Sequence, residues 1–195
     1  MPSSRMPTLR RRTKTIVLLL VALGSAACLA DSRRGVGLQY IAVGRDAIAG
    51  SGFGLGVYQL SKTSDEPGWF FDLHGATDGK VPNDTRAPDG YDGSQDQVVD
   101  RMTSILSLNV GPTLRLCDWV HAYGGVGVGV QWDSEIRFDG TLTASPDGTY
   151  RTTANQSTLL SSSFGLQFPL GDSSLLGIGY DTLLEGPVFT LGLIW

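Results

Sequence analysis

The sequence predicts an all-β protein: an eight-stranded antiparallel transmembrane β-barrel with short periplasmic turns and two long outer loops. Apolar and polar residues alternate with a period of two along most of the chain after residue 30, which is the pattern of strands with two unlike faces. The polar face is rich in Gly and nearly uncharged, as a narrow barrel interior would be. Aromatic residues stand near the strand ends, where a membrane-interface girdle belongs: Trp69, Trp119, Trp132, Tyr180 and Trp195.

Each expected strand is defined by its apolar face. In chain order these faces are Leu38, Tyr40 and Ala42; Phe53, Leu55 and Val57; Phe71 and Leu73; Leu106, Leu108, Val110, Leu114 and Leu116; Val120, Ala122, Val126, Val128 and Val130; Phe164, Leu166 and Phe168; Leu176, Ile178 and Tyr180; and Phe189, Leu191, Leu193 and Trp195. The first strand has the weakest pattern and the last has the clearest. Eight strands of about ten residues suit a transmembrane barrel. A last strand that ends in an aromatic residue is the type of signal read by the barrel insertion machinery, which we expect as a partner.

A soluble β-sandwich has the same period of two and is the alternative fold. Its solvated face would carry Lys and Glu, which this chain lacks at those positions. The connections also alternate in length. They are short near residues 63–68, 117–118 and 171–173 and long near 78–100 and 133–156. A membrane barrel with short periplasmic turns and longer outer loops has this order.

Composition excludes other classes of protein. Of 195 residues, 41% are apolar, 17% are charged and 26 are Gly, whereas soluble domains average about 25% charged residues and about 7% Gly. Because Gly costs about 1 kcal/mol at an interior helical site, a helical bundle is disfavoured. Residues 31–195 hold ten Lys or Arg against nineteen acids, a net charge of −9. We therefore expect no nucleic-acid partner.

Residues 1–30 are expected to be a signal peptide. A basic run precedes the apolar stretch Thr15–Leu23, and small residues ending at Ala30 follow, which is the order of regions in a secretory signal. The apolar stretch is too short for a membrane-spanning helix, which needs about 20 residues. We expect cleavage after Ala30 and a single barrel domain over 31–195. Lipidation at Cys28 is left open as an alternative.

Polar side chains on the inward face are expected to form a network inside the barrel. Eight strands leave room only for side chains, so a hydrogen-bonded plug is favoured over a solute pore or a catalytic cluster. Buried charges need partners, and we expect Arg115 to pair with Asp72. The network is expected to contain Asp72, His74, Arg115, Tyr123, Gln167 and Asp181, with Asn109 and His121 on the same face.

The outer segment 133–156 is expected to be a hairpin that continues two strands above the membrane. Pro146-Asp147-Gly148 is a turn signal, and Thr and aromatic residues on both sides favour strands. A projecting sheet offers an edge to which a partner can add a strand, with Phe138 and Tyr150 as anchors. The alternative role is a spacer against the lipopolysaccharide layer.

The other long loop, 78–100, contains six Asp. Its carboxylates could bind Ca²⁺, but the spacing is not that of an EF-hand, and Asp and Gly also favour ordinary solvated turns. Both interpretations stay open for this loop. We expect no cofactor and no metal elsewhere.

Two stretches of the C-terminal half resemble the Ail/Lom/OmpX family of outer-membrane proteins. Asn-Val-Gly-Pro-Thr-Leu-Arg-Leu-Cys-Asp-Trp at 109–119 is followed by Tyr-Gly-Gly-Val-Gly-Val-Gly at 123–129, and Gly-Leu-Gln-Phe at 165–168 is similar to a later family segment. The resemblance covers 104–195 well and the earlier part only in strand rhythm. The chain departs from the family pattern in ending with Trp195 instead of Phe.

The resemblance implies a barrel in the outer membrane of a Gram-negative cell, in contact with lipid and lipopolysaccharide. Some members of the family act in adhesion to host cells and in serum resistance, so we expect a surface protein whose outer loops contact host surface proteins. A structural protein without a dedicated ligand is the alternative. A lipid A-modifying enzyme is less favoured, because such enzymes use His and Ser near the outer rim. Here His121 follows a periplasmic turn and His74 lies in mid-strand.

Overall fold

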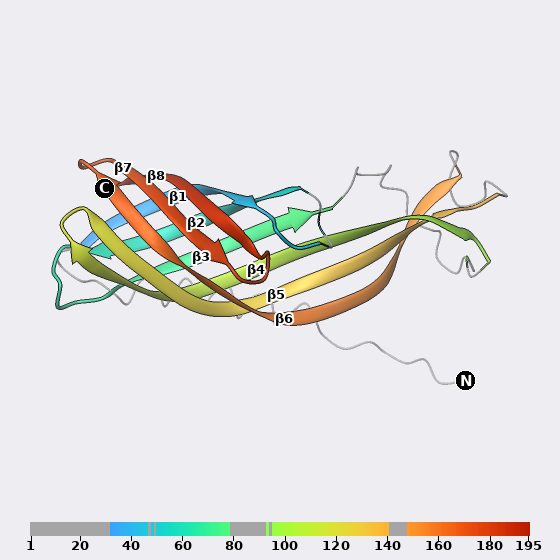
Figure 1. Cartoon of the computed structure of the whole chain (residues 1–195), viewed down its shortest axis with the longest axis horizontal. Coiled ribbons are helices and arrows are strands. Elements are labelled where there is room, and N and C mark those ends of the chain that lie inside the picture. The colour runs from blue at the N-terminus through green and yellow to red at the C-terminus, as the bar shows by residue number, and fades with distance from the viewer. Residues whose placement is uncertain (1–31, 47, 49, 79–92, 94, 141–147) are drawn as a thin grey trace, which may run out of the picture. The chain divides into compact units, whose positions relative to one another are not determined.

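Eight antiparallel strands form a closed barrel, as the sequence predicts (Figure 1). The computed structural model describes residues 32–46, 48, 50–78, 93, 95–140 and 148–195. The expected signal peptide, Cys28 and Ala30 lie outside these residues. No helix in the described part of the chain is long and apolar enough to cross a membrane. The strands are β1 (Ser32–Ala42), β2 (Ser51–Ser61), β3 (Gly68–Thr77), β4 (Gln97–Cys117), β5 (Val120–Phe138), β6 (Thr149–Leu170), β7 (Ser174–Asp181) and β8 (Gly186–Ile194).

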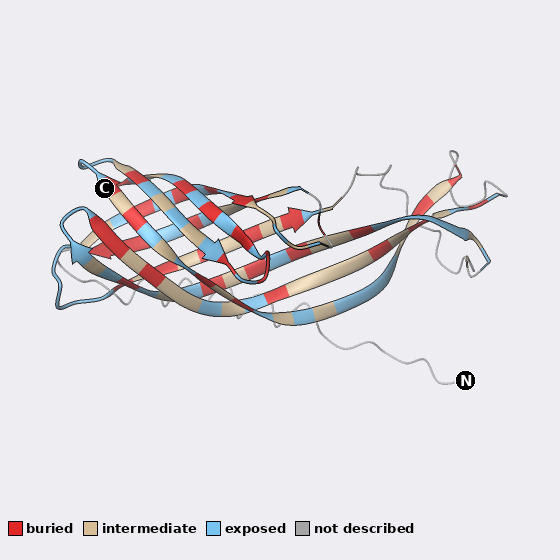
Figure 2. Cartoon of the chain, in the orientation of Figure 1, coloured by how far each residue is buried: buried red, intermediate tan, exposed pale blue. Residues whose placement is uncertain are grey.

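The outward face of the barrel carries a continuous apolar belt, called here the apolar ring, which winds once around the barrel and rises along the strands as it does so. Following the paired residues once around the barrel from Phe168 in β6 leads back to Leu160, eight residues earlier in the same strand. Every residue on this path is apolar, and most are exposed on the outside (Figure 2). The path is Phe168, Leu176, Leu191, Leu38, Leu55, Leu73, Leu108, Val128 and Leu160. Such a ring suits hydrocarbon and would be costly in water.

Aromatic pairs flank the ring on the same outward face. Toward the end where the strand β1 finishes, Tyr40 and Phe53 meet edge to face with centroids 5.9 Å apart. At the opposite end Trp119 stacks on Phe168 at 6.4 Å. We call the second end, which holds the termini of the barrel and its short turns, the periplasmic end, and the first the outer end. The two levels match the girdles that membrane barrels place at both interfaces.

The interior is filled by three layers of side chains. An apolar cluster closes the periplasmic end, with members Tyr58, Leu60, Phe70, Tyr123, Leu175 and Ile194. A second apolar cluster closes the outer end, with members Ile41, Ile48, Ala76, Ile105, Leu183, Leu184 and Val188. Polar side chains occupy the middle layer. The barrel is therefore a packed core, consistent with the width of an eight-stranded ring.

Interior glycines make room for two large side chains. A Cβ on Gly56 would collide with the Tyr58 ring, and a Cβ on Gly179 would collide with the hydroxyl of Tyr123. Both tyrosines are almost fully buried. The inward face is rich in Gly because the rings of these tyrosines occupy the space that other side chains would need.

Three strands are much longer than the expected ten residues. β4, β5 and β6 have 21, 19 and 22 residues and extend far past the outer ends of the other strands (Figure 1). β3 pairs with β4 only from Thr113 back to Ser104, and β7 pairs with β6 only from Ser163 onward. Beyond those points the long strands form a three-stranded sheet of their own. Most residues of the outer segment 133–156 belong to β5 or β6 in this sheet, as expected for a hairpin that continues two strands.

Substituting Arg at the centre of the apolar ring tests the lipid-facing assignment. Leu191→Arg should lower the free energy of unfolding by about 2–4 kcal/mol, the cost of a cation at the middle of the bilayer. Thr153→Arg, on the exposed part of β6, should change it by less than about 0.5 kcal/mol. Urea unfolding of protein refolded into phospholipid vesicles measures both. Equal effects of the two substitutions would show that Leu191 does not face lipid.

Candidate functional site

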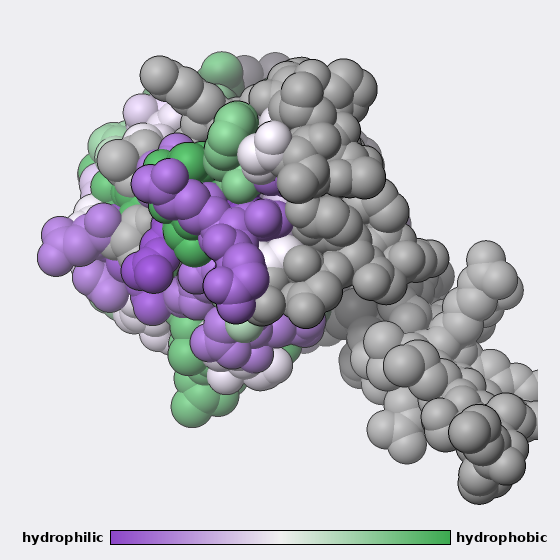
Figure 3. Space-filling view, turned by 90° about the vertical axis from the view of Figure 1, so that its right-hand side faces the viewer, coloured by the Kyte–Doolittle hydropathy of each residue, from purple (hydrophilic) through white to green (hydrophobic). Residues whose placement is uncertain are grey.

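The candidate site is the three-stranded sheet formed by the outer parts of β4, β5 and β6. β4 pairs with β5 from Ser104 and Trp132 outward to Gln97 and Phe138. On its other side β5 pairs with β6, and Phe138 and Thr149 are the outermost pair. Met102, Ser134, Ile136 and Tyr150 are buried in this sheet, whereas Gln97–Arg101 and Thr153–Gln156 are exposed. The turn at 141–147 lies outside the described residues. Seen end-on from this side, the described surface is largely hydrophilic (Figure 3).

Tyr150 is buried within this sheet, with 3% of its surface exposed. Its hydroxyl donates a hydrogen bond to Asp96 Oδ2 at 2.7 Å. Burial, and then the hydrogen bond to Asp96, raise the pKa of Tyr150 to about 12. Tyr150 therefore joins β6 to the segment that enters β4. The sequence placed it as an exposed anchor, but in this structure its ring is covered.

Arg137 makes a second cross-link in the same layer. Its guanidinium donates to Glu135 Oε2 at 2.7 Å and to the carbonyl oxygen of Gly93 at 2.6 Å. The hydrogen bond that Arg137 donates to the Glu135 carboxylate raises the pKa of Arg137 further above its ordinary value. β5 is therefore tied to the chain that precedes β4. Together with the Tyr150 bond, this contact stiffens a sheet that has no barrel interior to pack on.

Phe138 is the exposed aromatic residue at the tip of the sheet. It is 42% exposed and pairs with Gln97. Val98 and Val99 at the start of β4 are also exposed, at 36% and 50%, but Val98 pairs with Arg137 and so lies on the other face of the sheet from Phe138. Of the two aromatic residues expected to anchor a partner, Phe138 is accessible.

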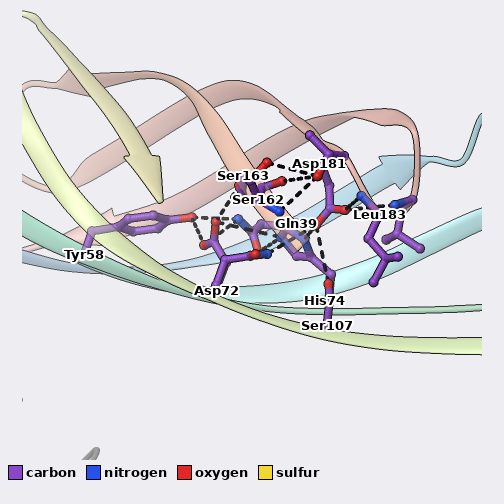
Figure 4. Close-up of polar contacts among 12 residues, drawn as sticks. Gln39, Tyr58, Asp72, His74, Ser107, Ser162, Ser163, Asp181 and Leu183 are labelled. Carbon is purple, nitrogen blue, oxygen red and sulfur yellow. Dashed lines mark hydrogen bonds and ion pairs between the residues drawn. The ribbon is translucent and has the colours of Figure 1, made fainter. Parts of the chain in front are cut away.

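Inside the barrel, two carboxylates and one imidazole form the centre of the polar layer (Figure 4). His74 Nδ1 lies 2.6 Å from Asp181 Oδ2, and His74 Nε2 lies 3.1 Å from Gln39 Oε1. Both ring nitrogens face oxygen atoms of buried side chains, so His74 joins Asp181 to Gln39 across the barrel interior. Gln39 in turn donates to Asp72 and to Tyr58. All five side chains are buried.

Asp181 also organises the turn between β7 and β8. Its Oδ1 accepts the backbone N–H groups of Leu183 and Leu184 at 2.8 and 2.9 Å. These two leucines belong to the apolar cluster that closes the outer end. Arg45 fixes the same turn by donating to the carbonyl oxygen of Leu183 at 3.1 Å. The polar layer and the outer closure therefore depend on one carboxylate.

The expected pair between Arg115 and Asp72 is not formed. Arg115 lies at the periplasmic end and makes an ion pair with Asp118 at 2.5 Å. Asp72 accepts hydrogen bonds from Gln39, Tyr58 and Ser163 instead. Arg115 is too near the strand end to reach the middle layer. The heights of Arg115 and Asp72 along the barrel axis depend on the stagger between strands, which the sequence does not show.

The other inward residues of the expected network are buried but dispersed. Asn109 donates weakly to Asp181 at 3.4 Å. Tyr123 lies in the periplasmic apolar cluster, while Gln167 is fully buried without a hydrogen-bond partner among the described atoms. His121 lies at the periplasmic end, where its Nε2 contacts the carbonyl oxygen of Ser61. The structure thus brings together Asp72, His74 and Asp181 and leaves the remaining residues outside that centre.

The geometry of the polar layer differs from that of a catalytic site. Ser107 donates to Asp181 at 3.4 Å and Ser163 donates to Asp72 at 3.2 Å, so neither hydroxyl is bonded to the His74 ring. A nucleophile and its base must be within hydrogen-bond reach. No group of three potential metal ligands occurs among the described residues. Most of the Asp-rich loop 78–100 lies outside them, and its Ca²⁺ hypothesis stays a prediction.

The network contains four residues that sequence reasoning did not select: Gln39, Tyr58, Ser107 and Ser163. Period two places all four on the inward face of their strands. The alternation does not show which inward residues lie at the same height along the barrel axis. On β8, the four residues proposed as an insertion signal, Phe189, Leu191, Leu193 and Trp195, are all exposed on the outward face.

Comparison with known proteins identifies the fold. The sequence matches no protein-family model and no curated protein. The structure is similar to the crystal structure of Ail, the attachment invasion locus protein of Yersinia pestis, in complex with the heparin analogue sucrose octasulfate, with a TM-score of 0.51 and 16% identity over 84% of this chain and 96% of that one. For the crystal structure of Ail without that ligand the TM-score is 0.50, with 18% identity over 84% and 94% of the two chains. The likeness shows a shared eight-stranded barrel fold.

Neutralising Asp181 should destabilise the whole barrel. Asp181→Asn replaces the carboxylate that accepts hydrogen bonds from His74, Leu183 and Leu184 with a neutral amide, and weakening buried hydrogen bonds to a charged group costs about 1.5–3 kcal/mol. Asp172→Asn removes the exposed partner of Arg33, and a surface pair contributes less than about 1 kcal/mol. Urea unfolding in vesicles compares the two. Loss of less than about 1 kcal/mol for both would contradict the central role assigned to Asp181.

Removing the Tyr150 hydroxyl should loosen only the projecting sheet. Tyr150→Phe loses the bond to Asp96, which contributes about 1–1.5 kcal/mol, so amide exchange around residues 149–151 should rise by about fivefold to tenfold. Because the folded-state pKa is raised to about 12, the stabilisation is complete below about pH 10, the ordinary value, and is lost as the pH rises through 12. Tyr180→Phe, on the lipid-facing surface, is the control. Exchange that is unchanged in Tyr150→Phe would show that the bond does not hold the sheet.

Proposed function

We propose that this chain is an exported surface protein of a Gram-negative outer membrane whose projecting sheet binds a partner outside the cell. The observation that carries the proposal is the sheet itself, because β4–β6 continue past the barrel as ordered, cross-linked structure. The barrel fold shared with Ail and the expected signal peptide support the location. Adhesion to host cells or serum resistance is the role this arrangement suits best.

The two free edges of the sheet differ in how well they are protected. The β4 edge, near Gln97–Thr103, is interrupted by a bulge between Val98 and Asp100 and carries Asp100 and Arg101. Charges and bulges are the usual means of preventing strand addition. The β4 edge is therefore a poor template for another strand.

The β6 edge is longer and unprotected. Among the described residues no strand pairs with β6 from Thr149 to Ser162 on the side facing away from β5. This stretch has no Lys and no Pro, and Arg151 is its one charged residue. An extended segment of a partner can add there through main-chain hydrogen bonds. The part of β6 from Thr149 to Gln156, beyond the lipid-facing Leu160, is accordingly the proposed docking edge, with Phe138 as an apolar contact at the tip.

Charge favours a protein over a polyanion as the partner. Segments 78–101 and 133–151 together hold ten acids against five Lys or Arg. Ail of Yersinia pestis was crystallised with a heparin analogue, but an acidic outer end repels sulfated chains. We infer that heparin-like ligands are not the partner of this chain.

Placing charge on each edge tests the proposal. The protein is displayed on cells that assemble barrels, and binding to host cells and survival in serum are measured. A β6 variant, Thr153→Lys with Gln156→Lys, should weaken binding by about tenfold, or about 1.4 kcal/mol. The matched β4 variant, Val99→Lys with Thr103→Lys, should bind as the unsubstituted chain does.

Heat-modifiable gel migration confirms equal amounts of folded barrel in every strain, and added heparin should not compete. If the unsubstituted chain behaves like empty cells, the recognition role is excluded for the ligands tested, which favours a structural role. Altered lipid A mass in the expressing cells would instead favour the lipid-modifying alternative.

A further inference from the structure

The apolar residues on the outer face of the barrel form a band whose height differs between the two sides. On β4 and on β6, six successive outward positions are apolar, apart from Ser162. They are Leu116, Leu114, Pro112, Val110, Leu108 and Leu106 on β4, and Leu170, Phe168, Leu166, Phe164 and Leu160 with Ser162 on β6. At about 3.3 Å per residue and a strand tilt of about 40°, these ten residue steps make a band about 25 Å tall, the usual height for a membrane barrel.

The band is lower on the opposite side of the barrel. β7 and β2 each have three outward apolar residues: Leu176, Ile178 and Tyr180 on β7, and Phe53, Leu55 and Val57 on β2. The polar residues that bound them are Ser174 and Thr182 for β7, and Gln59 and Ser51 for β2. Three alternate positions span only about 10 Å along the barrel axis. β8 and β1, which lie between β7 and β2 in the ring, have bands of intermediate height.

The edge of β6 beside β7 shows the same difference in a second, independent way. The pairing of β7 with β6 ends at Asp181 and Ser163, and Thr182 donates its backbone N–H to the carbonyl oxygen of Ser162 at 2.9 Å. Past Ser162, no strand among the described residues pairs with this edge. Unpaired backbone N–H and C=O groups are too costly to leave in hydrocarbon. Water or lipid headgroups must therefore reach the level of Ser162 on this side of β6.

Leu160 points outward from the same stretch of β6 and requires the opposite environment. It is two residues past Ser162, is 87% exposed, and pairs with Val128, which is also exposed. Aliphatic side chains exposed in this way suit hydrocarbon. The boundary between hydrocarbon and water therefore drops across β6, from above Leu160 on the β5 side to Ser162 on the β7 side.

Aromatic residues follow the same uneven boundary. On β2 the band ends at Phe53 and on β5 it ends at Trp132, each followed by a Ser on the same face. The paired residues that start at Phe53 lead through Gly75 and Leu106 to Val130, two residues short of Trp132. The outer aromatic girdle therefore lies further from the periplasmic end on β5 than on β2.

We propose that this barrel holds the bilayer thinner along β7, β8, β1 and β2 than along β4, β5 and β6, so that its short side fits a locally deformed lipid surface. The headgroups of the outer leaflet come down to Thr182 and Ser51 on that side. A bilayer adapts to a short apolar band by thinning, and the cost per Å of mismatch is modest. Leaving the free edge of β6 in hydrocarbon would cost more, because its backbone groups would lack hydrogen-bond partners. The proposal does not depend on a partner for the projecting sheet, so it stands or fails separately from the surface role.

Two positions at one height compare the two sides of the barrel. Thr182 follows β7 and bonds to Ser162 of β6, and Ser162 pairs with Val126 of β5. Because the eight-residue stagger is shared among eight strands, each step from β7 toward β5 moves one residue closer to the periplasmic end. Val128, two residues further out than Val126, is therefore level with Thr182.

Spin labels on single cysteines at these positions test the proposal in phosphatidylcholine vesicles. The native Cys28 and Cys117 are replaced by Ser, and Thr182→Cys and Val128→Cys are labelled separately. Oxygen, which dissolves in hydrocarbon, should collide with the label at 128 more often than a water-soluble nickel chelate does, and the order should be reversed at 182. The labels should differ in depth by about 10 Å, the rise over the four residues from Val128 to Trp132. Heat-modifiable gel migration confirms folding, and equal depths would overturn the proposal.

A tilted barrel in a bilayer of even thickness would also separate these two labels, so a third position distinguishes the two cases. Leu114, in the periplasmic half of β4, is 50% exposed on the outward face. A tilt that sinks the outer ends of β4, β5 and β6 into hydrocarbon would push this position out into water. With thinning, the label of Leu114→Cys stays in hydrocarbon and collides more often with oxygen. A label at 114 that meets the nickel chelate more often than oxygen would overturn the proposal in favour of a tilt.

Discussion

Closure of the strand ring between β1 and β8 is the constraint on which the rest of the structure depends. In hydrocarbon, each unpaired backbone N–H or C=O costs several kcal/mol, so a sheet can cross only if it has no edge. Seven antiparallel residue pairs between β1 and β8 complete the ring. Once the ring is closed, its eight-residue stagger sets which side chains share a level inside and which form the apolar ring outside.

The interior follows from that stagger. Eight strands enclose too little space for water-filled passage, so apolar clusters close both ends and polar groups gather between them. Asp181 connects these parts, because one of its oxygens binds His74 and the other binds the turn that inserts Leu183 and Leu184 into the outer mouth. A buried charge of this kind is tolerated because it is surrounded by donors.

In the outer sheet the strands no longer form a closed ring. β4, β5 and β6 leave the membrane together, and among the described residues no strand pairs with β4 or β6 beyond the points where β3 and β7 stop. Water can satisfy those backbone groups there, which lipid cannot. The sheet is held by its own contacts, through Tyr150 and Arg137, so its edges stay extended and available.

The sequence by itself determined the class of fold, the number of strands, the lipid-facing residues and the projecting hairpin, because a period of two is a local property of neighbouring residues. It also placed Asp72, His74 and Asp181 on the inward face. Only the tertiary structure decided which inward residues meet. His74 and Asp181 are 107 positions apart, and their contact depends on the register of all eight strands. The same reason explains why Arg115 does not reach Asp72 and why Tyr150 is covered by the segment before β4.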